Sequence, residues 1–263
     1  MDTSPTLANP IFPLEIEHLI FTHGVEKRHL KPFPINLILV ARRVYYWLCP
    51  IIYRTIRLDA SIEYPIRWDH ENLEKHGGYV RHLFIASFSS RLEMSPALPL
   101  SFCPNITHLM GWSFVDIPGM IEEIARLPLT HLSINLYEVN PTPILKKTLS
   151  KVTHLDNLGV FYDDDLALLD HFPSLTHLST LGGHSAVTSL FEKLPKLKVV
   201  IFYDCHDSIT RPVVQELNAD EDHPMLVRMS RGTNGGFGDW FDDIMDRGGI
   251  WELAEEVIEK RKQ

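Results

Sequence analysis

A four-residue phrase, an apolar residue followed by Thr, His and Leu, returns at a constant interval through the middle of the chain. Its histidines are each 23 residues apart: His108, His131, His154 and His177. Looser copies lie 26 residues earlier, around His82, and 22 residues later, around Val199. A constant period of this length indicates one structural unit stacked on copies of itself. It therefore limits the fold to architectures in which each unit packs against neighbours of its own kind.

Each period is expected to hold one strand and one helix. Apolar residues at helical spacing lie between the phrases, in residues 117–127, 143–149, 166–172 and 187–194. A proline just before most copies ends the preceding helix, because the residue before proline avoids helical dihedral angles. A unit this small cannot bury its own apolar face, so stacking should give a parallel sheet with helices behind it.

The strand phrases CPNITHL and FPSLTHL resemble those of leucine-rich repeats. The resemblance implies an α/β solenoid over residues 57–222, with parallel strands on the concave side and helices on the convex side. The third apolar position of the strand is kept in three copies, as Ile85, Ile134 and Phe202. Polar or small residues replace it in the others, as Gly111, Asn157 and Thr180. The repeats are therefore degenerate.

Residues 1–56 are expected to form a separate helical module. Pro13 suits the first turn of a helix, and Gly24 is expected to end that helix. A second helical run should follow Pro34, and Pro50 should begin a short last segment.

The runs PLEIEHLIF and LILVARRV in this module resemble an F-box, and WLCPIIYRTIRL resembles the tail of F-box-like modules common in mushroom-forming fungi. In that family the helices bind a Skp-type adaptor, which links the protein to a cullin-based SCF ubiquitin ligase. Ala41 and Val44 depart from the usual cysteine and tryptophan of the family. The alternative is a helical cap that covers one end of the repeats. By position, the resemblance implies these adaptor-binding residues: Phe12, Pro13, Leu14, Ile16, Leu19, Ile20, Phe21, Leu37 and Val40.

Residues 223–263 are expected to form a C-terminal cap. Met225–Met229 has the pattern of a last strand, and two helices should follow around Trp240 and Trp251. These helices would bury the open end of the repeat stack. The glycine-rich stretch 231–238 lacks the Lys-Ser/Thr pair of a phosphate-binding loop, so we interpret it as a loop.

Composition limits the partners and the compartment. A net charge of −9 without a basic stripe argues against nucleic-acid binding. Three dispersed cysteines without metal-ligand spacing favour a reducing compartment, the cytoplasm or nucleus. The most apolar stretch, residues 35–56, is interrupted by arginines, so we expect no membrane span.

The repeated histidines are expected to point away from the core, because they alternate with apolar residues along each strand. They would form a ladder with rungs about 4.8 Å apart. Metal sites need ligands that converge on one point, whereas a ladder spreads its ligands along a line. Two adjacent charged rungs would repel by about 1 kcal/mol even in water, so the ladder should stay mostly neutral near pH 7.

Two other clusters could suggest catalysis but are better explained otherwise. Asp163–Asp165, with His171 nearby, suits the acidic first turn of a helix. Cys205, His206 and Asp207 are consecutive, and sequence neighbours rarely converge as a catalytic triad must. We therefore expect no catalytic residues, no bound metal, no cofactor and no enzymatic activity.

Aromatic residues follow several of the expected strands, and such side chains favour protein recognition. They are Trp112, Phe114, Tyr137, Phe161, Tyr162 and Tyr203. We expect a target protein to contact the concave face through His108, His131, His154, His177, Trp112, Tyr137 and Tyr203. The expected function is substrate recognition for an SCF-type ubiquitin ligase. The alternative is a protein-binding repeat scaffold without a ligase link.

Overall fold

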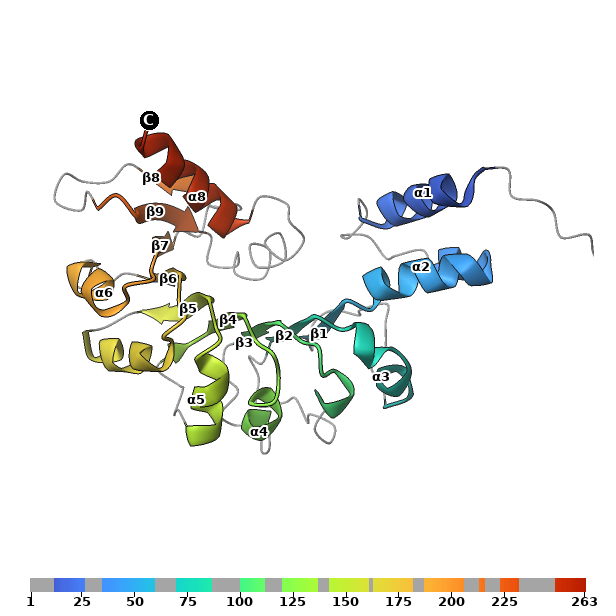
Figure 1. The fold of residues 1–263 in the computed structure, drawn as a ribbon, viewed down its shortest axis with the longest axis horizontal. Helices are drawn as coiled ribbons and strands as arrows, with labels where there is room; N and C mark the ends of the chain where they lie inside the picture. The colour runs from blue at the N-terminus through green and yellow to red at the C-terminus, as the bar shows by residue number, and fades with distance from the viewer. Residues whose placement is uncertain are drawn as a thin grey trace, which may run out of the picture.

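The repeats form a single parallel sheet (Figure 1). The computed structural model describes residues 12–26, 35–59, 70–86, 100–111, 120–136, 142–160, 163–181, 187–205, 213–215, 223–231 and 249–263. Within these residues the strand order is β1-β2-β3-β4-β5-β6-β7-β9-β8. Neighbouring strands are parallel except β8 and β9, which are antiparallel. The strands are β1 (Thr55–Asp59), β2 (His82–Ala86), β3 (His108–Gly111), β4 (His131–Ile134), β5 (His154–Val160), β6 (His177–Leu181), β7 (Val199–Cys205), β8 (Val213–Gln215) and β9 (Leu226–Arg231).

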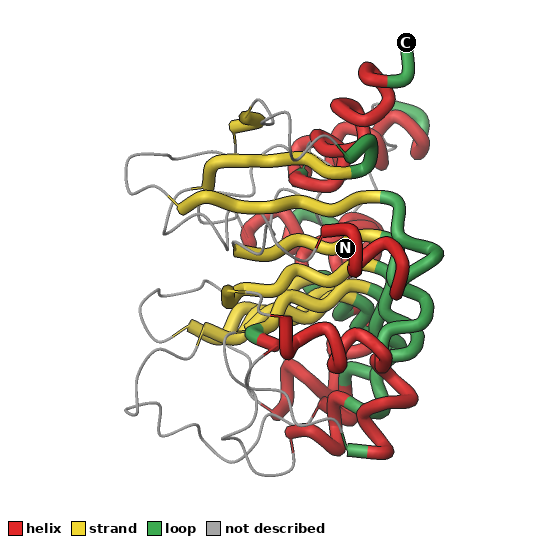
Figure 2. Tube along the Cα trace, turned by 90° about the vertical axis from the view of Figure 1, so that its left-hand side faces the viewer, coloured by secondary structure: helices red, strands yellow, loops and turns green. Residues whose placement is uncertain are grey.

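Short helices connect the strands and cover one face of the sheet. They are α3 (His70–His76), η2 (Gly77–Tyr79), η3 (Leu100–Phe102), α4 (Met120–Ile124), α5 (Pro143–Leu149), η5 (Asp163–His171) and α6 (Val187–Lys193). Figure 1 shows the strands along an arc with these helices on its outer side, and Figure 2 shows the strands stacked on one another. The chain is thus α/β with a parallel sheet, consistent with a repeat solenoid.

The repeated phrase sets the register of the sheet, as the sequence predicted. His108, His131, His154 and His177 are direct partners on adjacent parallel strands. The leucine after each histidine points to the outer side and joins the main core with the helices. Backbone bonds repeat at the same place in each unit: the amide nitrogen of Thr130 donates to the carbonyl oxygen of Thr107, 2.9 Å away.

The N-terminal helices differ in their boundaries from the expectation. Helix α1 (Leu14–Glu26) continues past Gly24. The second helical run is divided into η1 (Ile35–Leu39) and α2 (Arg42–Ile52), because Ala41 between them is extended. Pro50 lies inside α2 rather than at the start of a segment, near the end of the helix, where a missing amide proton removes one hydrogen bond. The buried side chains of Val44 and Leu48 form the centre of this region.

The C-terminal helix α8 (Ile250–Arg261) does not cover the end of the sheet, contrary to the expectation. It lies on the inner side of the arc against β7 and β9 (Figure 1), while β8 is the last strand of the sheet. The reason is that the inner faces of β7 and β9 are apolar, so they also need a cover. The other expected helix, around Trp240, lies outside the described residues. Among the described helices, none is both long and apolar enough to cross a membrane.

Candidate functional site

The histidine ladder, which comprises His82, His108, His131, His154 and His177, lies on the inner face of the sheet. Successive rings from His108 to His177 are stacked, with centroids 4.0, 4.1 and 4.1 Å apart and planes within 13°. His82 instead meets His108 edge-on, with centroids 4.8 Å apart. The centroids of the stacked rings are thus closer together than neighbouring strands, which are about 4.8 Å apart.

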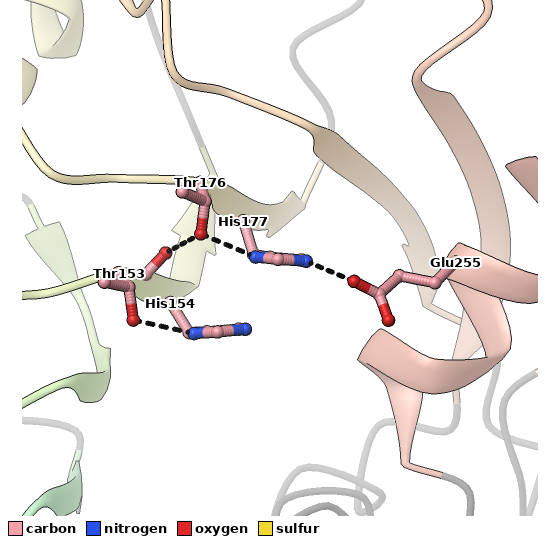
Figure 3. Close-up of polar contacts among 5 residues, drawn as sticks. All are labelled: Thr153, His154, Thr176, His177 and Glu255. Atoms are coloured by element: carbon pink, nitrogen blue, oxygen red, sulfur yellow. Dashed lines mark hydrogen bonds and ion pairs between the residues drawn. The ribbon is translucent and has the colours of Figure 1, made fainter.

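Threonine hydroxyls hold the stacked rings in place. In each of these rungs the Nδ1 atom lies 2.8 to 2.9 Å from the Oγ1 atom of the preceding threonine. Figure 3 shows two of these pairs, Thr153 with His154 and Thr176 with His177. His82 follows Arg81, so its Nδ1 pairs instead with Oγ1 of Thr55 on the neighbouring strand, 3.0 Å away. The different hydrogen-bond partner of Nδ1 explains why the His82 ring is oriented differently from the other rungs.

The ladder is held in its neutral form. Burial lowers the pKa of His82 to about 3, of His108 to about 2, of His131 to about 4 and of His154 to about 2. Repulsion from neighbouring histidines adds to the effect, and at His82 the positive charge of Arg54 contributes more than that repulsion. Burial also lowers the pKa of His177, while the Glu255 carboxylate opposes that shift.

Helix α8 covers one end of the ladder. The Glu255 Oε1 atom lies 3.0 Å from Nε2 of His177 (Figure 3). A carboxylate only accepts hydrogen bonds, so Nε2 of His177 carries a proton. One turn earlier on α8, the Trp251 ring lies edge-on to His154 and His177, with centroids 5.5 and 5.6 Å away.

The inner face is not the broad exposed surface that the sequence led us to expect. The residues two positions after the histidines also point inward, and all are nearly inaccessible: Phe84, Met110, Ser133, Asp156 and Ser179. A small, partly open hollow remains between the start of α8 and the middle rungs. His131, His154, Asp156 and Trp251 are among its lining residues. His108, His131 and His154 are half-buried, whereas His177 is buried.

Of the aromatic residues expected at the rim, only Tyr203 lies among the described residues. Tyr203 is only 2% exposed and packs beneath α8, so it does not lie at an open edge. The reason is that its side chain points to the inner face of β7, which α8 covers. The expected rim residues Trp112, Phe114, Tyr137, Phe161 and Tyr162 lie outside the described residues, as do His206 and Asp207.

A second surface is formed by the N-terminal helices, where most of the expected adaptor-binding residues are exposed. Six apolar side chains are 43 to 62% exposed: Phe12, Leu14, Ile16, Leu19, Ile20 and Val40. Pro13 is also exposed. Phe21 and Leu37 are half-buried and pack against Val44 and Leu48, so they support the helices from inside. Leu39 and Tyr46 are exposed as well and were missed, although both flank the residues that the resemblance assigned.

Polar and aromatic contacts join α1 to α2. Nε of Arg43 donates to the Glu17 carboxylate at 2.9 Å, and the rings of His18 and Trp47 meet edge-on at 5.2 Å. These contacts hold α1 against α2. We call Phe12, Pro13, Leu14, Ile16, Leu19, Ile20 and Val40 the α1 surface.

The described residues provide no evident metal centre, since no three His, Cys, Asp or Glu side chains among them are placed to hold an ion. The thiols of Cys49 and Cys103 are free and buried, and burial raises the pKa of both. Two candidate surfaces therefore remain among the described residues, the α1 surface and the inner face under α8. Comparisons of the chain with protein-family models, with curated proteins and with solved structures find no match.

Proposed function

We propose that the protein is a substrate-recognition subunit of an SCF-type ubiquitin ligase. Its N-terminal helices are an F-box-like module that binds a Skp-type adaptor, and its repeats are degenerate leucine-rich repeats that bind a target protein. The protein catalyses nothing itself. It acts by raising the effective concentration of the target near the ligase.

The α1 surface is the observation that carries this proposal. Contiguous exposed apolar side chains on a helix are unfavourable in water, and they mark sites where another protein binds. Seven of the nine residues that the F-box resemblance assigns to the adaptor are exposed, although burial was not part of that assignment. Leu14 and Ile20 are each about half exposed, so they stabilise the fold little and remain available to a partner.

Binding of the full chain to a purified Skp-type adaptor tests the proposal by calorimetry. The Leu14→Ala/Ile20→Ala double variant should bind at least about tenfold more weakly, because apolar anchors dominate such interfaces. Its melting temperature should be unchanged, since exposed substitutions alter stability by about 0.5 kcal/mol or less. Ile144→Ala is the matched control, because Ile144 is an exposed apolar residue on the distant helix α5. Absence of binding by the wild-type chain at micromolar concentration would favour a repeat scaffold without a ligase link.

A further inference from the structure

Helix α8 is seated on an apolar patch that is separate from the main core. The patch consists of inward-pointing side chains of β7 and β9: Val199, Ile201, Tyr203, Val227 and Met229. The α8 side chains packed on it include Ile250, Trp251, Ala254 and Ile258. The main core, on the other face of the sheet, is built from the strands and the outer helices and includes no α8 residue among those described. Removing α8 would therefore expose the patch and leave the main core packed.

The contacts of α8 show which helix this face accepts. Trp251 and Glu255 are one turn apart, so both lie on the same side of the helix. The tryptophan ring contacts the edges of two stacked imidazoles, and the carboxylate accepts a hydrogen bond from His177. The neutral ladder places N–H donors and aromatic rings beside an apolar patch. An amphipathic helix with an aromatic residue and a carboxylate one turn later satisfies all of these groups.

We propose that the inner face over β7 and β9, together with His154 and His177, binds an amphipathic helix of the target protein, and that this helix displaces α8. The proposal rests on the proposed function, because it identifies the kind of segment that the target presents to the ligase. The target helix carries an aromatic residue and, four residues later, a glutamate or aspartate. It binds as helices bind apolar grooves elsewhere. While α8 can dock, the apparent affinity for the target equals the intrinsic affinity multiplied by the fraction of molecules in which α8 is undocked.

The test uses a fluorescent peptide with the sequence of residues 249–263 as a stand-in for the target helix. Its binding is measured by anisotropy against the full wild-type chain and against Trp251→Ala. The variant should bind at least about tenfold more tightly, because removing a buried aromatic anchor weakens the docking of its own α8 and frees the face. Glu256→Gln, on the exposed side of α8, is the control and should bind like the wild type.

Two further changes check that the peptide occupies the expected place. Adding His177→Ala to Trp251→Ala should weaken peptide binding about tenfold, because the carboxylate loses its donor. The second change is in the peptide: its tryptophan is replaced by alanine, and its binding to the Trp251→Ala protein is measured. This peptide should lose most of its affinity. Because the protein is the same in both measurements, a change in protein folding cannot explain the loss.

Three results would overturn the proposal. The first is equal peptide affinity in the wild type and Trp251→Ala. The second is loss of the cooperative melting of the repeats in Trp251→Ala, which would show that α8 belongs to the core. The third is a wild-type dimer that dissociates on Trp251→Ala, which would assign the face to a second copy of the chain. Adaptor binding is measured on the same samples, so a failure of the ligase proposal appears separately from these outcomes.

Discussion

Acidification should destabilise the protein through its histidine ladder. Below about pH 6.5 the histidines of the unfolded chain bind protons, whereas the folded rungs His82, His108, His131 and His154 have pKa values of about 2 to 4. The unfolded state therefore binds more protons between these values, and stability falls as the pH falls. The loss begins near the unfolded pKa and continues until the folded rungs themselves protonate.

The magnitude follows from the linkage relation. Between about pH 7.5 and pH 5.5, a histidine that stays neutral when folded contributes a loss of about 1.4 kcal/mol. Four rungs together give about 5 kcal/mol, which is comparable to the whole stability of many domains.

Urea unfolding at both pH values, followed by circular dichroism, measures this loss. In His131→Gln the loss should be smaller than in the wild type by about 1.4 kcal/mol, since one titrating rung is gone. His23→Gln, at an exposed position on α1, should behave like the wild type. If His131→Gln loses as much stability as the wild type over this range, the neutral buried ladder is not the cause of the acid sensitivity.

Two substitutions test the packing between repeats, each against a matched control. Gly77→Ala should lower stability by about 1 to 3 kcal/mol in thermal melts, because an added Cβ would overlap the backbone carbonyl of Phe102, whereas Gly78→Ala, with no atom within 4 Å, should have little packing cost. Asn157→Ala should cost about 2 to 4 kcal/mol, because buried hydrogen-bonding groups would lose their partner, and Asn105→Ala, at an exposed asparagine, should cost less than about 1 kcal/mol. Equal losses within either pair would contradict the corresponding explanation.

The register of the sheet could be predicted because every unit reuses one pattern. With a leucine directly after each histidine and a fixed period, only one alignment places all the leucines in the core. Some helix positions were also predicted correctly: the helix expected over residues 143–149 is α5. Residues 166–172 were expected to be helical, and the structure has a 3-10 helix there, η5, over Asp163–His171.

Asn157 and Thr180 illustrate why a departure from the pattern was misjudged. Both stand where an apolar residue was expected, yet both are buried and hydrogen-bonded. Nδ2 of Asn157 donates to Oγ1 of Thr180 at 3.1 Å, and its Oδ1 accepts from the backbone of Leu136 at 3.0 Å. The sequence marked these positions as degenerate, but a partner 23 residues away is visible only once the strands are aligned.

The place of α8 could not be predicted from its own sequence, because an amphipathic helix fits equally well over a sheet end or a sheet face. The signal lay elsewhere, in the uninterrupted apolar run Val199–Tyr203. Such a run is typical of a strand buried on both faces. Interpreted as a strand buried on both faces, this run would have predicted that another element covers the inner side of β7 and that Tyr203 is buried.

The repeated Thr–His pair also determines how the chain can change in length. The carbonyls of Thr107, Thr130, Thr153 and Thr176 each accept backbone bonds from the next unit, so within the sheet a rung is bonded to its immediate neighbours. A duplication of one whole period between β3 and β4 would add a strand, a helix and a rung with every bond satisfied. Helix α8 contacts β7, β9 and the histidines of β5 and β6, and these contacts would be unchanged. The molecule can therefore lengthen in whole periods, whereas a residue inserted within a strand would turn the side chains after it to the opposite face of the sheet.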